Sequence, residues 1–336
     1  MDGPSTEADS AILGIVVIGR NEGERLRSCL ESVCGGDRRV VYVDSNSSDG
    51  SPALARSLGA EVVELDMSIP FSAARARNAG FERLKQVAPD VAYVQFVDGD
   101  CEVVSTWLGA GLRALQGAPD VAVVCGRRRE RHPERSIYNA LCDIEWDSDV
   151  GEANSCGGDA MMRADAFAAV GGFDPALVAG EEPELCFRLR AKGHRILRLP
   201  EEMTLHDAAI DHFSQWWKRS VRSGHAYAEF AFLHGHSKER DALRSTLSNV
   251  FWALGVPLGS SAVLRLPGGP AAALGLYFVL AARIFKGQIQ KGRTPRQALS
   301  FALFTSAGKF AETLGAGRFL FGVLTGKRSR IIEYKG

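Results

Sequence analysis

The sequence lacks the features that mark several other classes of protein. Its seven cysteines are scattered and include no Cys-x-x-Cys pair, so neither a zinc site nor a disulfide framework is indicated, and we expect a reducing compartment. Lys and Arg number 40, as do Asp and Glu, so no basic excess favours nucleic acid as a partner. Residues 1–10 are acidic and polar, without the basic and apolar regions of a signal peptide, and we expect a disordered leader.

The residues that are present suit a folded protein with a large core. Apolar residues make up 46% of the 336 residues, and charged residues make up 24%. Both values are ordinary for soluble proteins. A chain of this length accommodates one large domain, or one domain with an appendage.

Strands and helices are expected to alternate through the first hundred residues. Apolar runs rich in β-branched residues predict strands at residues 12–18, 40–43, 62–65 and 93–97. Helical patterns separate them at residues 26–33, 51–58 and 73–84. The strands are almost wholly apolar, which predicts an α/β fold with a mostly parallel sheet and helices on both faces. Asp44 and Asp98 then fall at carboxyl ends of strands, where one crevice can collect them.

Two carboxylates stand one residue apart where the fourth strand ends. Asp98 and Asp100 flank Gly99, directly after the apolar run that begins at Tyr93. Carboxylates with this spacing at a turn can hold one hard divalent cation, which takes oxygen ligands. The alternative is a simple Asp-Gly turn without a ligand, since Gly accepts a positive φ angle and Asp hydrogen-bonds its own turn.

Four short segments of this half of the chain carry a resemblance to a known family through their order and spacing. They are Ile15–Glu22, Val43–Gly50, Ala74–Gly80 and Asp98–Asp100. In sequence and spacing they resemble the nucleotide-sugar-binding half of the family 2 glycosyltransferases, which have the GT-A fold, and the chain looks like a membrane-associated bacterial member with an inverting mechanism.

The resemblance implies a nucleotide-diphosphate sugar as donor and Mg²⁺ or Mn²⁺ as cofactor. It implies that Asp44 contacts the nucleotide base, that Arg77 lies near the diphosphate, and that Asp98 and Asp100 hold the metal. A bridging cation neutralises the charge that develops as the glycosidic bond breaks, and an arginine adds donors suited to phosphate. Arg77 could equally lie on a solvated helix face. The other residues expected to bind the nucleotide-sugar are Ile18, Arg20, Glu22, Asn46, Asp49, Asn78, Asp98 and Gly99.

A later acidic pair resembles the family's catalytic segment. Glu181 and Glu182 precede a helical pattern and have Pro183 beside them, so they lie at the start of a helix. The family typically shows Glu-Asp here, with Asp as the general base that removes the proton of the acceptor hydroxyl. The resemblance points to Glu182, and leaves Glu181 as the other candidate. Acidic residues also favour the positive end of a helix dipole without any catalytic role.

The segments around this pair add one metal candidate. Residues 121–125 predict a further strand, and residues 127–135 a charged surface loop. Residues 195–199 predict another strand, which Pro200 is expected to end. His206 follows it at a position that supplies a third metal ligand in some family members, and an imidazole can join carboxylates on Mn²⁺. A structural histidine is the alternative.

The C-terminal third suggests a membrane-associated helical region. Residues 213–224 look like a degraded form of the Gln-x-x-Arg-Trp segment of membrane-bound synthases, with Arg222 at the Arg position and within reach of a phosphate. No charged residue occurs at residues 245–264 or 266–282, and residues 266–270 are rich in Pro and Gly. This pattern fits a hairpin that crosses or enters a bilayer from the cytoplasmic face, or a buried helical pair. Residues 297–324 fit an amphipathic interfacial helix, or a helix that packs on the hairpin.

The sequence as a whole predicts three regions, namely a leader at 1–10, a GT-A domain at 11–235 and a helical membrane-associated region at 236–336. We expect a metal-dependent, inverting transfer of a sugar to a hydroxyl on a saccharide or lipid-linked acceptor, at the cytoplasmic face of the membrane. Synthesis of a cell-surface polysaccharide, exopolysaccharide or glycolipid is the expected setting. The alternatives are transfer to a polyprenyl phosphate, a sugar-phosphate nucleotidyltransferase, and a non-catalytic nucleotide-sugar-binding module.

Overall fold

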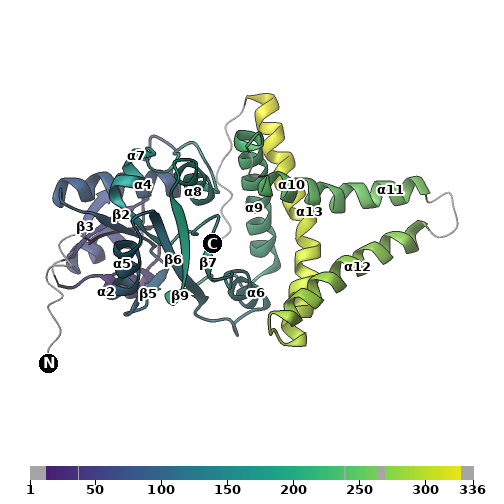
Figure 1. The fold of residues 1–336 in the computed structure, drawn as a ribbon, viewed down its shortest axis with the longest axis horizontal. Helices are drawn as coiled ribbons and strands as arrows, with labels where there is room; N and C mark the ends of the chain where they lie inside the picture. Colours follow the sequence, from purple (N-terminus) through teal and green to yellow (C-terminus); the bar gives the residue numbers. More distant parts are fainter. Residues whose placement is uncertain (1–12, 37, 238–239, 264–268, 327–336) are drawn as a thin grey trace. The chain divides into compact units, whose positions relative to one another are not determined.

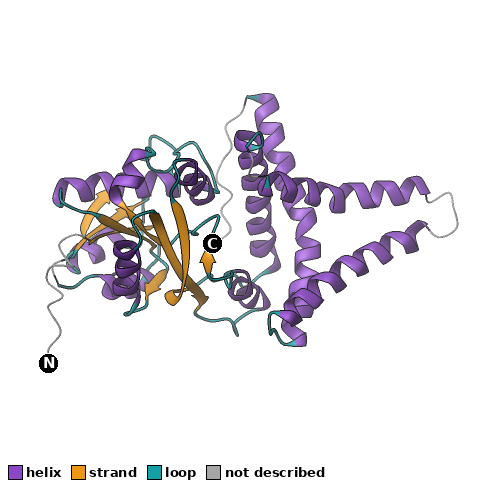
Figure 2. Cartoon of the chain, in the orientation of Figure 1, coloured by secondary structure: helices purple, strands orange, loops and turns teal. Residues whose placement is uncertain are grey.

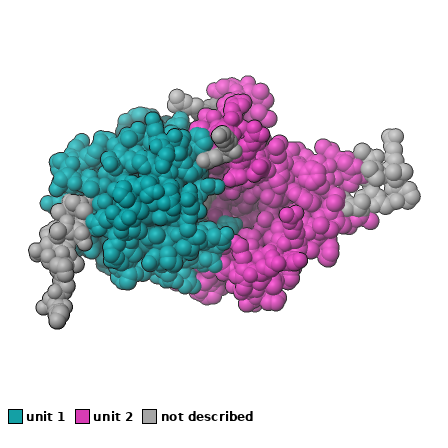
Figure 3. Space-filling view, in the orientation of Figure 1, with its two compact units in different colours: residues 1–131, 145–177, 181–208 teal, residues 132–144, 178–180, 209–336 magenta. Residues whose placement is uncertain are grey.

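The computed structural model describes residues 13–36, 38–237, 240–263 and 269–326, which form two compact units (Figure 3). The first unit comprises residues 1–131, 145–177 and 181–208, and the second comprises residues 132–144, 178–180 and 209–336. The leader expected at residues 1–10 lies outside the described residues, as does most of the junction expected at 266–270.

The first unit is built on a nine-stranded sheet (Figures 1 and 2). Eight of its strands follow the order β3-β2-β1-β4-β8-β6-β9-β5, and the ninth, β7, pairs with β9. Its strands are β1 (Leu13–Gly19), β2 (Arg39–Asp44), β3 (Glu61–Glu64), β4 (Tyr93–Asp98), β5 (Cys101–Val103), β6 (Val121–Glu130), β7 (Gly151–Glu152), β8 (Ala160–Arg163) and β9 (Arg195–His206). Its helices are α2 (Glu24–Val33), α3 (Ser51–Ser57), α4 (Ala73–Val87), α5 (Trp107–Gly117), α7 (Ala164–Ala169) and α8 (Glu181–Ala191).

The parallel half of the sheet confirms the predicted alternation of strands and helices. Strand β1 pairs in parallel with β2 on one side and with β4 on the other. Right-handed crossovers therefore place α2 and α3 on one face and α4 on the other. The chain reverses its direction of winding between β1 and β4, which is where ligands bind in open α/β sheets. Gly19 is opposite Asp44 and Ile18 is opposite Asp98, so both carboxylates reach this point.

The other half of the sheet is mixed and differs from the prediction in two strands. Strand β8 is antiparallel to both β4 and β6, and β5 is antiparallel to β9. Pro200 does not end β9, which continues to His206. The register against β6 shifts between Arg198 and Glu202, so Pro200 lies in an irregular part of the ladder where its missing N–H is tolerated.

Strand β6 is also longer than predicted. It runs from Val121 to Glu130, so the expected charged loop at residues 127–135 is strand for its first four residues. Alternation along the strand makes Glu130 buried and leaves Arg129 exposed. Charge alone therefore gave a wrong assignment for this segment, because pairing with β9 holds it in the sheet.

The second unit is helical within the described residues. Its elements are α6 (Ile137–Glu145), α9 (Phe213–His234), α10 (Asp241–Val250), the π-helix η1 (Phe251–Gly255), α11 (Val256–Val263), α12 (Gly269–Gln290) and α13 (Pro295–Thr325). The unit includes α9, which lies before the domain boundary expected at residue 235, because α9 packs along α13. Their backbones nearly touch, since a Cβ atom on Gly224 would overlap the backbone of Glu312, and one on Gly315 would overlap that of Val221.

None of the described helices has both the length and the apolar content required to cross a bilayer. The apolar stretches at residues 245–264 and 266–282 instead divide among α10, η1, α11 and α12. Many of their large side chains are nevertheless exposed, among them Leu258 at 67% and Phe278 at 73%.

Candidate active site

The Asp98-Gly99-Asp100 turn lies directly against the end of β1. The Gly99 N–H donates a hydrogen bond of 2.8 Å to the Ile18 carbonyl oxygen. A Cβ atom at Gly99 would lie 3.0 Å from that oxygen, so a larger residue would push the turn away. Asp100 is 7% exposed, while the side chain of Asp98 is 26% exposed. The turn therefore holds one carboxylate inside the protein and leaves the other partly accessible.

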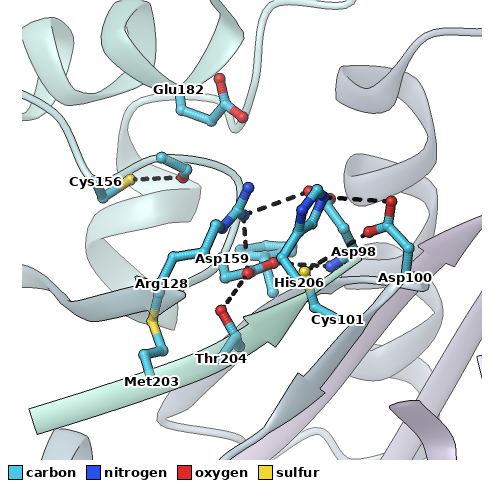
Figure 4. A network of polar contacts seen from close by, with 12 residues as sticks. Asp98, Asp100, Cys101, Arg128, Cys156, Asp159, Glu182, Met203, Thr204 and His206 are labelled. Carbon is cyan, nitrogen blue, oxygen red and sulfur yellow. Dashed lines mark hydrogen bonds and ion pairs between the residues drawn. The ribbon is translucent and has the colours of Figure 1, made fainter. Parts of the chain in front are cut away.

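His206 joins Asp100 because β5 and β9 pair with Cys101 opposite His206. The imidazole Nε2 lies 3.3 Å from Asp100 Oδ2 (Figure 4), and Trp146 packs edge-on against the ring with centroids 4.7 Å apart. One ligand atom from each of Asp100, Cys101 and His206 falls within 4.8 Å of the others. A carboxylate and an imidazole suit Mn²⁺ and related divalent ions, so these residues fit the implied cofactor.

Asp98, by contrast, is held by two arginines. Arg77 Nη2 lies 2.7 Å from Asp98 Oδ1, and Arg128 Nη2 lies 3.5 Å from Asp98 Oδ2. Burial alone would raise the pKa of Asp98, but these two guanidinium groups hold it below its usual range. The two arginines therefore favour the ionised form of Asp98 and set the orientation of its carboxylate. Its oxygens belong to a different cluster from that of His206, one formed with Cys101 and Asp159.

Arg77 is a buried cation that connects β4 to α8. Its side chain is 2% exposed, and its Nη1 lies 2.8 Å from Glu181 Oε1 and 3.6 Å from Glu182 Oε1. With Asp98 it faces three carboxylates, and these raise its pKa although burial opposes this. The solvated helix face considered for Arg77 is wrong, since the side chain is buried. The role near a diphosphate stays a prediction.

Glu181 and Glu182 open α8 as predicted, but their surroundings differ. Glu181 is 4% exposed and accepts a hydrogen bond from Arg77. Glu182 has only the longer approach to Arg77, and its side chain is 17% exposed. Burial, with the neighbouring charge of Glu181, raises the pKa of Glu182 to about 7. Glu182 can therefore exchange a proton near neutral pH.

Arg128 and Asp159 form a second buried pair that the sequence reasoning missed. Arg128 Nη2 lies 2.8 Å from Asp159 Oδ2, which also accepts a 2.8 Å hydrogen bond from Thr204 Oγ1 (Figure 4). The other oxygen, Asp159 Oδ1, accepts the backbone N–H of Asp98 at 2.9 Å. Asp159 is fully buried, so it fixes both the backbone and the arginine that orient Asp98. The sequence predicted a strand only at residues 121–125. Extending this strand past Gly126 would have placed Arg128, by alternation, on the same face of the sheet as Gly126.

The residues expected to bind the nucleotide base form a network between two loops. Asp44 is 2% exposed and accepts hydrogen bonds from the Tyr42 hydroxyl at 2.9 Å and the Ser47 N–H at 2.8 Å. Burial, together with Asp44, raises the pKa of Tyr42. Asp49 Oδ2 accepts the Gly23 N–H at 2.9 Å, which ties the loop after β2 to the loop after β1. The predicted base-binding residue is thus rigidly held.

The remaining predicted residues have surroundings of their own. Arg20 stacks over Phe71, and Glu22 forms an ion pair with Arg25. Asn46 is exposed, with a φ angle of 68°. Asn78 exchanges two hydrogen bonds with the backbone of Phe173, a structural task, and Arg222 lies on α9 in the second unit.

Comparison with known proteins assigns the fold and the family. Residues 14–170 match the model of glycosyl transferase family 2. Glycosyltransferase AglE of Haloferax volcanii is 23% identical over 255 residues, covering 72% of this chain and 80% of AglE. The succinoglycan biosynthesis protein ExoA of Rhizobium meliloti is 28% identical over 207 residues, covering 57% of this chain and 62% of ExoA.

A solved structure shares the fold across nearly the whole chain. The mannosyltransferase PcManGT of Pyrobaculum calidifontis, in complex with GDP-mannose and Mn²⁺, superposes with a TM-score of 0.60 at 18% identity. The alignment covers 92% of this chain and 87% of PcManGT. The sheet with helices on both sides is therefore a GT-A-like fold, and residues 14–170 of this transferase match glycosyl transferase family 2.

Proposed function

We propose that this protein transfers a sugar, with inversion, from a nucleotide-diphosphate sugar to an acceptor hydroxyl, using a divalent metal. The observation that carries the proposal is the place of Glu182, whose Oε1 lies 3.6 Å from Nη1 of Arg77, the arginine that also pairs with Asp98. Burial and the neighbouring Glu181 raise the pKa of this carboxyl group to about 7. A group with this pKa is ionised often enough to accept a proton, and basic enough to remove one from a hydroxyl.

The proposed reaction is a single displacement. The acceptor oxygen forms a bond to the anomeric carbon as its proton moves to a Glu182 carboxylate oxygen, and the bond from that carbon to the diphosphate breaks. Asp100 and His206 would hold Mg²⁺ or Mn²⁺, which supplies positive charge opposite the departing diphosphate. The negative charge of Glu181, which accepts a hydrogen bond from Arg77, raises the pKa of Glu182 and so favours the protonated Glu182 formed in the step.

The first test is a donor assay. A panel of nucleotide-sugars with Mn²⁺ is expected to give nucleotide diphosphate release from one donor, and Asp100→Ala is expected to abolish it because a buried metal ligand is lost. Asp120→Ala is the matched control, because Asp120 is an exposed carboxylate paired with Arg195. Metal-dependent nucleotide binding without release would mean that the acceptor is required. Neither binding nor release from any donor would refute the proposed transfer.

The pH dependence of turnover tests the base directly. Glu182 must be ionised to act, so kcat/KM is expected to rise about tenfold per pH unit below its pKa of about 7 and to level off above it. Glu181→Gln removes a like charge and so lowers the pKa of Glu182. The rising limb of the pH profile of kcat/KM is then expected to move to lower pH.

The control for this profile is Glu184→Gln on the same helix. Glu184 is buried and bonds Arg188, so its loss is expected to leave the limb in place. A limb that does not move in Glu181→Gln would assign the titration to another group.

A further inference from the structure

Charge is unevenly distributed along the second unit. Between residues 242 and 326 the sequence holds a single acidic residue, Glu312, against nine basic ones. The basic residues are Arg244, Arg265, Arg283, Lys286, Lys291, Arg293, Arg296, Lys309 and Arg318. The chain as a whole is neutral, so this segment concentrates positive charge that the remainder of the chain offsets.

The same segment exposes two apolar stripes. Leu247, Phe251, Leu254 and Leu258 are exposed along α10, η1 and α11 at spacings of four, three and four residues, which is one helix face. A second stripe follows α13, and its exposed members are Leu299, Leu303, Phe310, Leu314 and Phe321. Contiguous apolar patches of this kind mark interaction sites in soluble proteins.

Helix α12 has exposed apolar residues on more than one face. Leu274 and Phe278 share a face and are 71% and 73% exposed, while Leu276 and Val279 lie on other sides and are 46% and 60% exposed. Exposed apolar side chains on several sides of one helix favour an apolar surrounding for that part of the helix. Neither α11 nor α13, which contact α12, covers these side chains.

A pocket of about 510 Å³ lies within the apolar stripes. Its lining includes Leu254, Phe310 and Phe321, and its one charged residue is Arg318. Among the described residues no carboxylate forms an ion pair with Arg318, which is exposed. The volume is within the range of about 300–1,000 Å³ found for ligand pockets. An apolar pocket beside a single free cation suits a molecule with a hydrocarbon chain and an anionic group.

We propose that the face formed by these stripes and α12 docks on a bilayer of anionic phospholipid, and that the pocket takes one acyl chain while Arg318 binds the phosphate. Helix α12 then lies in the interface, with its apolar side chains among the acyl chains and Arg283 and Lys286 among the headgroups. A second copy of the chain would bring two basic surfaces together, whereas an anionic bilayer complements them.

Vesicle binding of the full chain tests the docking. Co-sedimentation is expected with vesicles that contain phosphatidylglycerol, to weaken with phosphatidylcholine alone, and to weaken with added salt. Each basic side chain near the surface changes binding about fivefold, so Arg283→Gln with Lys286→Gln is expected to lower the partition coefficient about 25-fold. Leu274→Ser with Phe278→Ser is expected to lower the partition coefficient further, whereas Val150→Ser, at a residue 61% exposed in the first unit, is not.

Bound phospholipid tests the pocket. Mass spectrometry of the detergent-purified chain is expected to find one phospholipid per chain. Gly317→Leu fills the pocket, and no atom obstructs a Cβ there, so the variant folds and loses the lipid. Arg318→Gln also loses it.

Three results would overturn the proposal. One is a failure to bind anionic vesicles, with concentration-dependent dimers instead, which would show that a second copy covers the face. The second is vesicle binding unchanged in the α12 variants. The third is phospholipid retained in Gly317→Leu. None of these measurements needs a sugar donor, so they are independent of the proposed transfer.

Discussion

Glu182→Gln is expected to abolish transfer and at the same time to stabilise the folded protein above pH 7. The loss in kcat is about 10²–10⁴-fold, the usual contribution of a general base. Folding raises the pKa of Glu182 from 4.5 to about 7, so the folded state binds this proton more tightly than the unfolded state. Stability is therefore lost as pH rises from 4.5 through 7, and the loss reaches about 3 kcal/mol. Glutamine cannot ionise, so the variant avoids this loss.

The measurements are nucleotide diphosphate release and urea unfolding at pH 6 and pH 8, with nucleotide affinity as a third readout. Nucleotide affinity is expected to stay nearly unchanged, because Glu182 would act on the acceptor. Glu184→Gln serves as the control and should lose stability, since the ion pair between Glu184 and Arg188 on α8 is lost. Full turnover by Glu182→Gln would show that no base is needed, as for an acceptor whose attacking oxygen is already anionic, such as a polyprenyl phosphate.

Arg77→Met is expected to cost about 3–5 kcal/mol of unfolding free energy, the largest stability effect predicted for this site. The substitution removes the cation that lies 2.8 Å from the buried carboxylate of Glu181 and 2.7 Å from the partly accessible carboxylate of Asp98. Urea unfolding at pH 7 measures the loss. Arg83→Met on the same helix is the control, because Arg83 pairs with Glu61 on the surface, where such pairs contribute about 0–1 kcal/mol.

Two further variants separate structural from substrate-binding roles of Arg77. Adding Glu181→Gln to Arg77→Met is expected to restore part of the lost stability, since one uncompensated charge is removed. Arg77→Lys keeps the charge but lacks the fork that reaches both carboxylates, so an intermediate loss is expected. A stable Arg77→Lys with a large loss of donor affinity would instead favour the predicted role near the diphosphate.

The first half of the fold could be predicted because its signals are local. The strands around Val16 and Val97 are continuous apolar runs, and the loops after them begin with polar residues. Once parallel pairing is assumed, Asp44 and Asp98 must meet at one edge of the sheet, and the register places them there. Helix starts at Glu24, Ala73 and Glu181 were close to prediction for the same reason.

The second half depends on pairing between distant residues, which local patterns do not encode. Arg128 is directed inward because β6 pairs with β9, some 70 residues later in the chain. Asp159 reaches the backbone of Asp98 only because β8 inserts antiparallel beside β4. Neither contact leaves a mark on the hydrophobic pattern of its own segment. The charged residues after Cys125 were therefore expected on the surface, whereas Arg128 forms an ion pair with the buried Asp159.

The close approach of α9 and α13 at Gly224 and Gly315 has a consequence for the medium in which the second unit can exist. Helices that meet through long apolar side chains associate in water because the contact removes apolar surface from water. The hydrophobic effect does not favour such a contact in hydrocarbon. Here the backbones meet directly, and contact between backbone atoms is attractive in either solvent. This helix pair needs no water to stay associated, so it can keep the same packing whether its outer surfaces face buffer or lipid.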